Sequence, residues 1–134
     1  MRQEKSAGVV IHRDGEFLLL KYEAGHWGFV KGLIEEKESP EKTVLRECKE
    51  ETGIKGLEFV DGFKKRVVYF FKRDGKLTKK EVVFFLAETD RKRITLSEEH
   101  TDYVWLEFYD ALEKLTYKNT KNLLRKAKEH LERQ

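Results

Sequence analysis

Three glutamates lie close together near the middle of the chain, between residues 47 and 51. Spacings of three and four residues place side chains next to one another on a helix, so Glu47, Glu50 and Glu51 would share one face. Clustered carboxylates offer the oxygen ligands that hard divalent cations prefer. Glutamates on a helix face are more often only a solvated surface. The surrounding residues must therefore decide between a cation site and a plain surface.

The residues around these glutamates carry the signals of a capped helix. Ser39 is a favourable N-cap, Pro40 fits the first turn, and Gly53 suits a left-handed residue that ends the helix. The apolar face of this helix would carry Val44, Leu45 and Cys48. Glu51 falls at the border of that face. We therefore expect Glu51 to be the carboxylate that is partly buried.

The whole stretch from Gly32 to Ile54 follows one spacing pattern. It reads Gly32, five residues, Glu38, seven residues, and then Arg46-Glu47-Cys48-Lys49-Glu50-Glu51-Thr52-Gly53-Ile54. This resembles the signature of the Nudix hydrolases, G-x5-E-x7-R-E-U-x-E-E-x-G-U, in which U is a bulky apolar residue. Cys48, at a U position, is a mild departure that is apolar enough to pack. We refer to residues 32–54 as the box.

The resemblance implies a role for each residue of the box. Glu47, Glu50 and Glu51, together with Gly32, would hold Mg²⁺, with Mn²⁺ as an alternative, and one glutamate would accept the proton of the attacking water. Family members differ over which glutamate does so. Arg46 would orient the glutamates through charge-assisted hydrogen bonds. Glu38 would brace the loop against the helix, and Gly53 would end the helix.

Three shorter segments resemble the asymmetrical diadenosine tetraphosphate hydrolases within this family. They are His26-Trp27-Gly28-Phe29-Val30-Lys31-Gly32, Gly62-Phe63-Lys64 with Tyr69 downstream, and Ser97-Glu98-Glu99-His100 followed by Tyr103 and Trp105. Tyr69 and Tyr117 match aromatic positions that hold adenine by stacking in those enzymes. His26, Lys31 and Lys80 are the candidate substrate contacts that remain.

Three residues, two in or beside the box and one outside it, leave questions open. Glu99 lies outside it, and the resemblance makes it a candidate metal ligand or base; a surface loop glutamate is the alternative. Val30 stands where Pro is usual, so the loop entering the box lacks a fixed φ. Lys37 stands where Gly is common, which leaves the conformation of the loop before the helix open.

Length and composition limit the class of protein. A chain of 134 residues can bury its own core, so we predict a single domain over residues 1–134. A single cysteine fits a reducing cytoplasm. No apolar run approaches the roughly 18 residues that cross a bilayer, and the polar start MRQEKS is not a secretory signal. We therefore expect a soluble, cytoplasmic protein that does not enter membranes.

The pattern of apolar runs and turn residues predicts two hairpins and two helices. The hairpins span residues 6–22, turning at Asp14-Gly15, and residues 63–87, turning at Arg73-Asp74-Gly75-Lys76. Short strands are expected at 57–60, followed by a turn at Asp61-Gly62, and at 103–106; a helical turn is expected at 109–115 and an amphipathic helix at 119–132. This order predicts an α/β protein with a mixed β-sheet. It matches the Nudix fold, which is an α/β/α sandwich.

The second hairpin is strongly basic. Its cations between residues 64 and 80 are Lys64, Lys65, Arg66, Lys72, Arg73, Lys76, Lys79 and Lys80, against the single acid Asp74. Such a run could meet a polyphosphate. The alternative is an edge hairpin whose lysines discourage pairing with other chains. The net charge of the whole chain, +3, is too small to argue for a nucleic-acid partner.

Taken together, the resemblance implies a Mg²⁺-dependent hydrolase of a dinucleoside polyphosphate, with diadenosine tetraphosphate giving ATP and AMP. A divalent cation would offset the charge of the polyphosphate and activate water. Two alternatives stay open: a nucleoside triphosphate or 5′-RNA pyrophosphohydrolase, and a nucleotide-binding domain without turnover. The complete carboxylate set argues against the second. We expect a small-molecule nucleotide as the partner, no stable nucleic-acid partner, and a monomer or homodimer.

Overall fold

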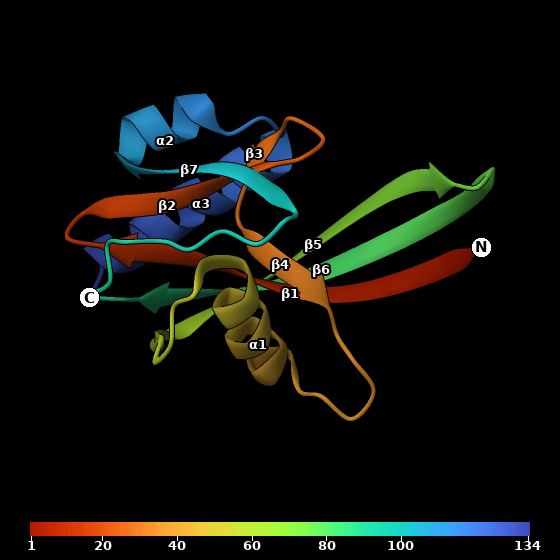
Figure 1. Cartoon of the computed structure of the whole chain (residues 1–134), viewed down its shortest axis with the longest axis horizontal. Coiled ribbons are helices and arrows are strands. Elements are labelled where there is room, and N and C mark those ends of the chain that lie inside the picture. Colours follow the sequence, from red (N-terminus) through yellow and green to blue (C-terminus); the bar gives the residue numbers. More distant parts are fainter.

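A computed structural model describes residues 1–134 and shows a mixed sheet between helices (Figure 1). The strands are β1 (Arg2–Arg13), β2 (Glu16–Tyr22), β3 (Trp27–Gly28), β4 (Val30–Leu33), β5 (Glu58–Arg73), β6 (Lys76–Glu88) and β7 (His100–Glu107). The helices are α1 (Pro40–Thr52), α2 (Phe108–Lys114) and α3 (Lys118–Glu132). None of these helices has both the length and the apolar character needed to cross a membrane.

Strand β1 lies at the centre of the sheet and connects its parts. It runs parallel to β6, which in turn pairs antiparallel with β5. Its other edge pairs antiparallel with β4 through residues 6–9 and with β2 through residues 12–13. Strand β2 also pairs antiparallel with β3 and β7. One parallel pair among antiparallel ones confirms the predicted mixed sheet.

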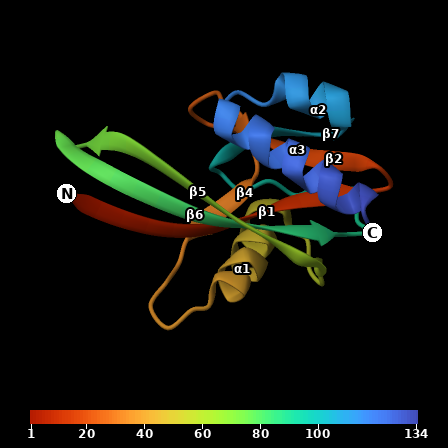
Figure 2. The ribbon, with the colours of Figure 1, turned by 180° about the vertical axis from the view of Figure 1, so that it is seen from behind.

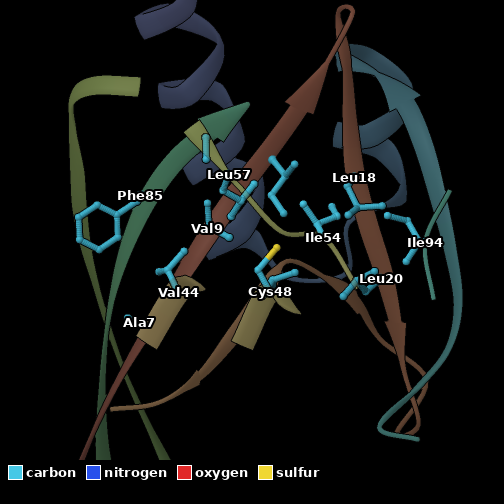
Figure 3. Packing of buried hydrophobic residues seen from close by; sticks show 13 residues of the cluster. Ala7, Val9, Leu18, Leu20, Val44, Cys48, Ile54, Leu57, Phe85 and Ile94 are labelled. Atoms are coloured by element: carbon cyan, nitrogen blue, oxygen red, sulfur yellow. The ribbon is translucent and has the colours of Figure 1, made fainter. Parts of the chain in front are cut away.

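Helices cover both faces of the sheet, which confirms the α/β/α sandwich (Figures 1 and 2). Helix α1 packs on one face, where Val44 and Cys48 join a core with Val9 of β1 and Phe85 of β6 (Figure 3). Helices α2 and α3 pack on the other face, in a second core to which α3 contributes Leu123, Leu124 and Ala127.

Both predicted hairpins are present and turn where the sequence indicates. Asp14 and Gly15 have φ values of 47° and 80°, and Asp74 and Gly75 have 52° and 76°. Two consecutive residues with positive φ suit the right-handed twist of the flanking strands, and Asp-Gly pairs adopt this conformation readily. Each hairpin is therefore closed by local turn chemistry.

Three expectations about the elements are wrong. Leu45 is 42% exposed, because the buried stripe of α1 runs through Val44 and Cys48. The Leu45 side chain is rotated by about 100° about the helix axis from that of Val44. Asp61-Gly62 is a bulge inside β5, where the register with β6 shifts between Phe59 and Lys64, and the strand continues through it. Strand β1 begins at residue 2 because its polar start pairs with β6.

Candidate active site

Helix α1 begins and ends as its sequence predicts. The Ser39 hydroxyl accepts a hydrogen bond from the Lys42 amide at 3.2 Å, and Pro40 occupies the first turn. Gly53 has φ 77° and its amide donates to the Lys49 carbonyl, which satisfies an orphan acceptor at the end of the helix. These caps fix the turns that carry the glutamates of the box.

Arg46 joins the loop before α1 to the glutamates on the helix. Its Nε donates to Glu38 Oε2 at 2.8 Å and its Nη2 to Glu38 Oε1 at 3.0 Å, a two-point pairing. Its Nη1 donates to Glu47 Oε1 at 2.7 Å, while Glu50 lies at 3.5 Å. The hydrogen bond from Arg46 is the main cause that lowers the pKa of Glu38 to about 2. Arg46 therefore has the contacts expected of an orienting residue, and Glu38 those of a brace.

The same contacts hold an unusual loop conformation. Lys37 has φ 66°, in the left-handed region that favours glycine. A side chain with Cβ costs roughly 1–2 kcal/mol in that region. Glu38, the next residue, also accepts hydrogen bonds from the Thr43 hydroxyl at 2.7 Å and the Glu35 amide at 3.1 Å. The loop thus keeps its shape although lysine replaces the usual glycine.

Gly32 allows β4 to cross directly above the glutamates. A Cβ built at Gly32 would overlap the carboxylate of Glu47. Any larger residue here would have to displace the Glu47 side chain or the strand. The glycine is therefore required by a close approach between β4 and α1.

Glu51 is a buried carboxylate without a hydrogen-bond partner. Its side chain is 2% exposed, and neither oxygen receives a donor. His100 Nε2 lies 3.3 Å from Glu51 Oε1, but not in the alignment of a hydrogen bond. Burial raises the pKa of Glu51 to about 10, and Glu47, Glu99 and Glu50 add to this rise. The sequence indicated the right carboxylate but underestimated its burial.

The carboxylate set fits a divalent cation in its chemistry. Glu51 presents two buried oxygens that lack a donor, with further carboxylate oxygens from Glu47 nearby. A cation is the group that would stabilise such an anion in the interior. The carboxylates do not surround one common point as a closed ligand set. Glu50 is 57% exposed, at the outer edge of the cluster.

Glu99 lies on the loop that precedes β7 and is exposed. Its carbonyl accepts a hydrogen bond from the Glu23 amide at 3.0 Å, which ties the two loops together. The Glu99 charge contributes to the raised pKa of Glu51, so the loop carboxylate lies near the helix cluster. The structure therefore places Glu99 beside the box; its role as ligand or base stays a prediction.

A cavity of about 500 Å³ opens on the α3 side of the sheet. It brings together four of the predicted substrate residues, His26, Lys31, Tyr69 and Tyr117. Lys31 Nζ donates to the Tyr69 hydroxyl at 3.1 Å and lies 5.5 Å from the centre of its ring. The fifth predicted residue, Lys80, does not line the cavity; it pairs with Tyr69 across the β5–β6 ladder. The cavity offers both aromatic and cationic side chains.

The structure adds site residues that the sequence analysis missed. Phe71 and Phe84 line the cavity. Alternation along the strand could have identified Phe71, since residues 69 and 71 of β5 point to the same face. Tyr22 lies between the two sites: its ring stacks on His26 at 4.4 Å and meets His100 edge-on at 4.4 Å. No sequence signal distinguishes Tyr22 from an ordinary strand tyrosine.

Burial and charge lower the proton affinity of several groups around the cavity. Burial lowers the pKa of Lys31. The pKa of His26 is lowered first by burial and then by the positive charge of the nearby Lys31. Lys31 lines the cavity and directly precedes Gly32, which lies against the Glu47 carboxylate, so the cavity lies next to the carboxylate cluster. The two features therefore form one continuous site.

Comparisons with known proteins agree with this geometry. The family model described as NUDIX domain matches residues 2–127. The asymmetrical bis(5′-nucleosyl)-tetraphosphatase of Mus musculus is 34% identical over 122 residues, covering 87% of this chain and 80% of the mouse protein. Its Caenorhabditis elegans counterpart is 33% identical, covering 91% and 92%. A solved C. elegans Ap4A hydrolase binary complex superposes with a TM-score of 0.84 at 32% identity, covering 96% of this chain and 97% of that one. The chain belongs to the Nudix hydrolase family.

Proposed function

We propose that this chain hydrolyses a phosphoanhydride bond of a dinucleoside polyphosphate, with diadenosine tetraphosphate giving ATP and AMP and Mg²⁺ as the cofactor. The proposal depends mainly on Glu51, a buried carboxylate that lacks a donor and lies next to a basic, aromatic cavity. The names of the mouse and nematode relatives support the substrate class.

The residues of the chain divide the work between the two parts of the site. Glu47, Glu50 and Glu51 would hold Mg²⁺, which when bound supplies Lewis-acid activation of phosphate and water. Lys31 and Lys80 would neutralise the phosphates. Tyr69 and Tyr117, with His26 beside Tyr117 at 5.2 Å, would stack on one adenine. One carboxylate of the cluster would take the proton of the attacking water.

Product analysis tests this proposal. The protein is incubated in MgCl₂ with diadenosine tetraphosphate, ATP, a modified dGTP and 5′-triphosphate RNA, and the products of each are separated by chromatography. ATP and AMP from diadenosine tetraphosphate, at the highest kcat/KM, would support the proposal. Two molecules of ADP, or preferred release of pyrophosphate from a mononucleotide or RNA, would refute it. Unchanged turnover in Glu51→Gln would show that the box is not the active site.

A further inference from the structure

Strands β1, β6 and β5 continue past the body of the protein as a three-stranded ribbon (Figures 1 and 2). The ribbon comprises residues 2–5, 69–73 and 76–81. Because side chains alternate along a strand, Tyr69, Phe71 and Arg73 share one face, and Phe70 points to the other. Tyr69 and Phe71 line the cavity, so this face of the ribbon continues the cavity outward.

An ion pair joins two strands at the outer end of this face. Arg73 Nη1 lies 2.5 Å from Glu4 Oε2, and the guanidinium carbon lies 5.1 Å from the centre of the Phe71 ring. The other Glu4 oxygen is buried without a hydrogen-bond donor and lies 4.0 Å from Lys80 Nζ. Glu4 thus holds Arg73 over Phe71, while the Arg73 side chain stays 47% exposed. We call Phe71 and Arg73 the outer platform.

A row of cations connects the cavity with the outer platform. Lys31 Nζ lies 3.1 Å from the Tyr69 hydroxyl, and Lys80 pairs with Tyr69 across the β5–β6 ladder. Lys80 Nζ and Arg73 Nη1 both approach the Glu4 carboxylate, at 4.0 and 2.5 Å. Glu4 offsets part of the charge of Lys80 and Arg73, but three cations exceed this single carboxylate, so the row favours a polyanion. Tyr117 lines the cavity beside His26, and Phe71 of the outer platform lines the same cavity from the ribbon. The cations therefore lie among aromatic side chains from two parts of the fold, Tyr117 of the body and Phe71 of the ribbon.

We propose that the outer platform binds the second nucleoside of the substrate. This inference rests on the proposed function, because only a dinucleoside polyphosphate carries a base at both ends of its phosphate chain. Phe71 and Arg73 provide the flat, cationic surface on which any base can stack. Glu4 acts as a positioning residue, since it touches Arg73 and Lys80 and not the substrate.

The test compares diadenosine tetraphosphate with adenosine 5′-tetraphosphate, which lacks the second nucleoside. The measured quantity is the ratio of their kcat/KM values. In Phe71→Ala and in Arg73→Ala we expect this ratio to fall about tenfold, as for the loss of one stacked base. Phe70→Ala, on the opposite face of the same strand, should leave the ratio within twofold. An unchanged ratio in the two platform variants, or an equal fall in Phe70→Ala, would overturn the inference.

The positioning role of Glu4 is tested by a double-variant cycle. Glu4→Gln should lower the ratio on its own and add nothing when combined with Arg73→Ala, because its effect passes through Arg73. Additive losses would refute that role. If neither substrate is turned over, the proposed function fails by itself. Binding of a nucleoside by the outer platform is then tested by the Kd of a methylene-bridged diadenosine tetraphosphate analogue. This Kd should rise about tenfold in Phe71→Ala, and an unchanged Kd would overturn the inference.

Discussion

Replacing Glu51 by glutamine should stabilise the metal-free protein while it abolishes activity. The pKa of this carboxyl is about 10 in the fold and 4.5 ordinarily. Between those values the folded state holds a proton that the unfolded chain has lost. The free energy of unfolding of the wild type therefore falls as pH rises, by at most about 1.4 kcal/mol per pH unit. The neighbouring carboxylates share this proton, which reduces the slope.

The expected gain of Glu51→Gln is about 2 kcal/mol at pH 7.5, or about 6 °C in Tm for a domain of this size. It should shrink to about 0.4 kcal/mol at pH 4.5, where the unfolded chain is half protonated at this carboxyl, and vanish below that pH. The assay is thermal unfolding in EDTA from pH 4.5 to 8.5. MgCl₂ at pH 7.5 should raise the Tm of the wild type and leave that of the variant unchanged.

A matched control comes from the same helix. Glu50 is 57% exposed, so Glu50→Gln should change the unfolding free energy by less than about 0.5 kcal/mol at every pH. A wild type whose stability does not depend on pH, or a Glu51→Gln variant that is less stable at pH 7.5, would contradict the assigned burial. Stabilisation by Glu50→Gln equal to that by Glu51→Gln would contradict it as well.

Three further substitutions test other contacts of the site. Arg46→Ala releases Glu38 and Glu47, so it should lower the free energy of unfolding in urea by about 1–3 kcal/mol and kcat at least tenfold. Arg46→Lys should recover less than half of the lost stability and activity, since lysine lacks the two-point pairing. Full recovery by lysine would contradict the role of that pairing. Gly32→Ala should lower kcat at least tenfold, because its Cβ would overlap Glu47; normal steady-state kinetics would show that the approach is looser. Tyr117→Ala should raise KM about tenfold and Tyr117→Phe less than twofold; a large effect of the phenylalanine would indicate a hydrogen bond instead of stacking.

The features that the sequence predicted well depend on local signals. Ser39, Pro40 and Gly53 fix helix α1 by themselves, and the Asp-Gly pairs fix both hairpins, since each signal acts over a few residues. The same locality misled the reading of Asp61-Gly62, because a bulge and a turn use the same residue types. Only pairing with β6, and the bond from the His130 ring to the Asp61 carbonyl at 2.7 Å, decide that this strand continues.

The features that the sequence missed depend on contacts between distant segments. Arg2 to Lys5 is polar and has no strand pattern of its own; it becomes a strand because the edge of β6 is free to pair with it. That pairing brings Glu4 to Arg73, a contact across 69 residues of sequence. Alternation places Phe71 on the face of Tyr69, but the neighbours that make this face part of the cavity come from other elements. The contact between Glu4 and Arg73, which completes the outer platform, could therefore be found only in the folded chain.

Tyr22 contacts both parts of the site. Its ring touches His26, which lines the cavity, on one side and His100, next to Glu51, on the other. Its hydroxyl donates to the Phe29 carbonyl, so the ring cannot slide without breaking that bond. A nucleotide that moves His26 must either carry Tyr22 along or forfeit a stacking contact of about 1 kcal/mol. Because such coupling is reciprocal, occupancy of the carboxylate cluster and of the cavity should influence each other through this one side chain.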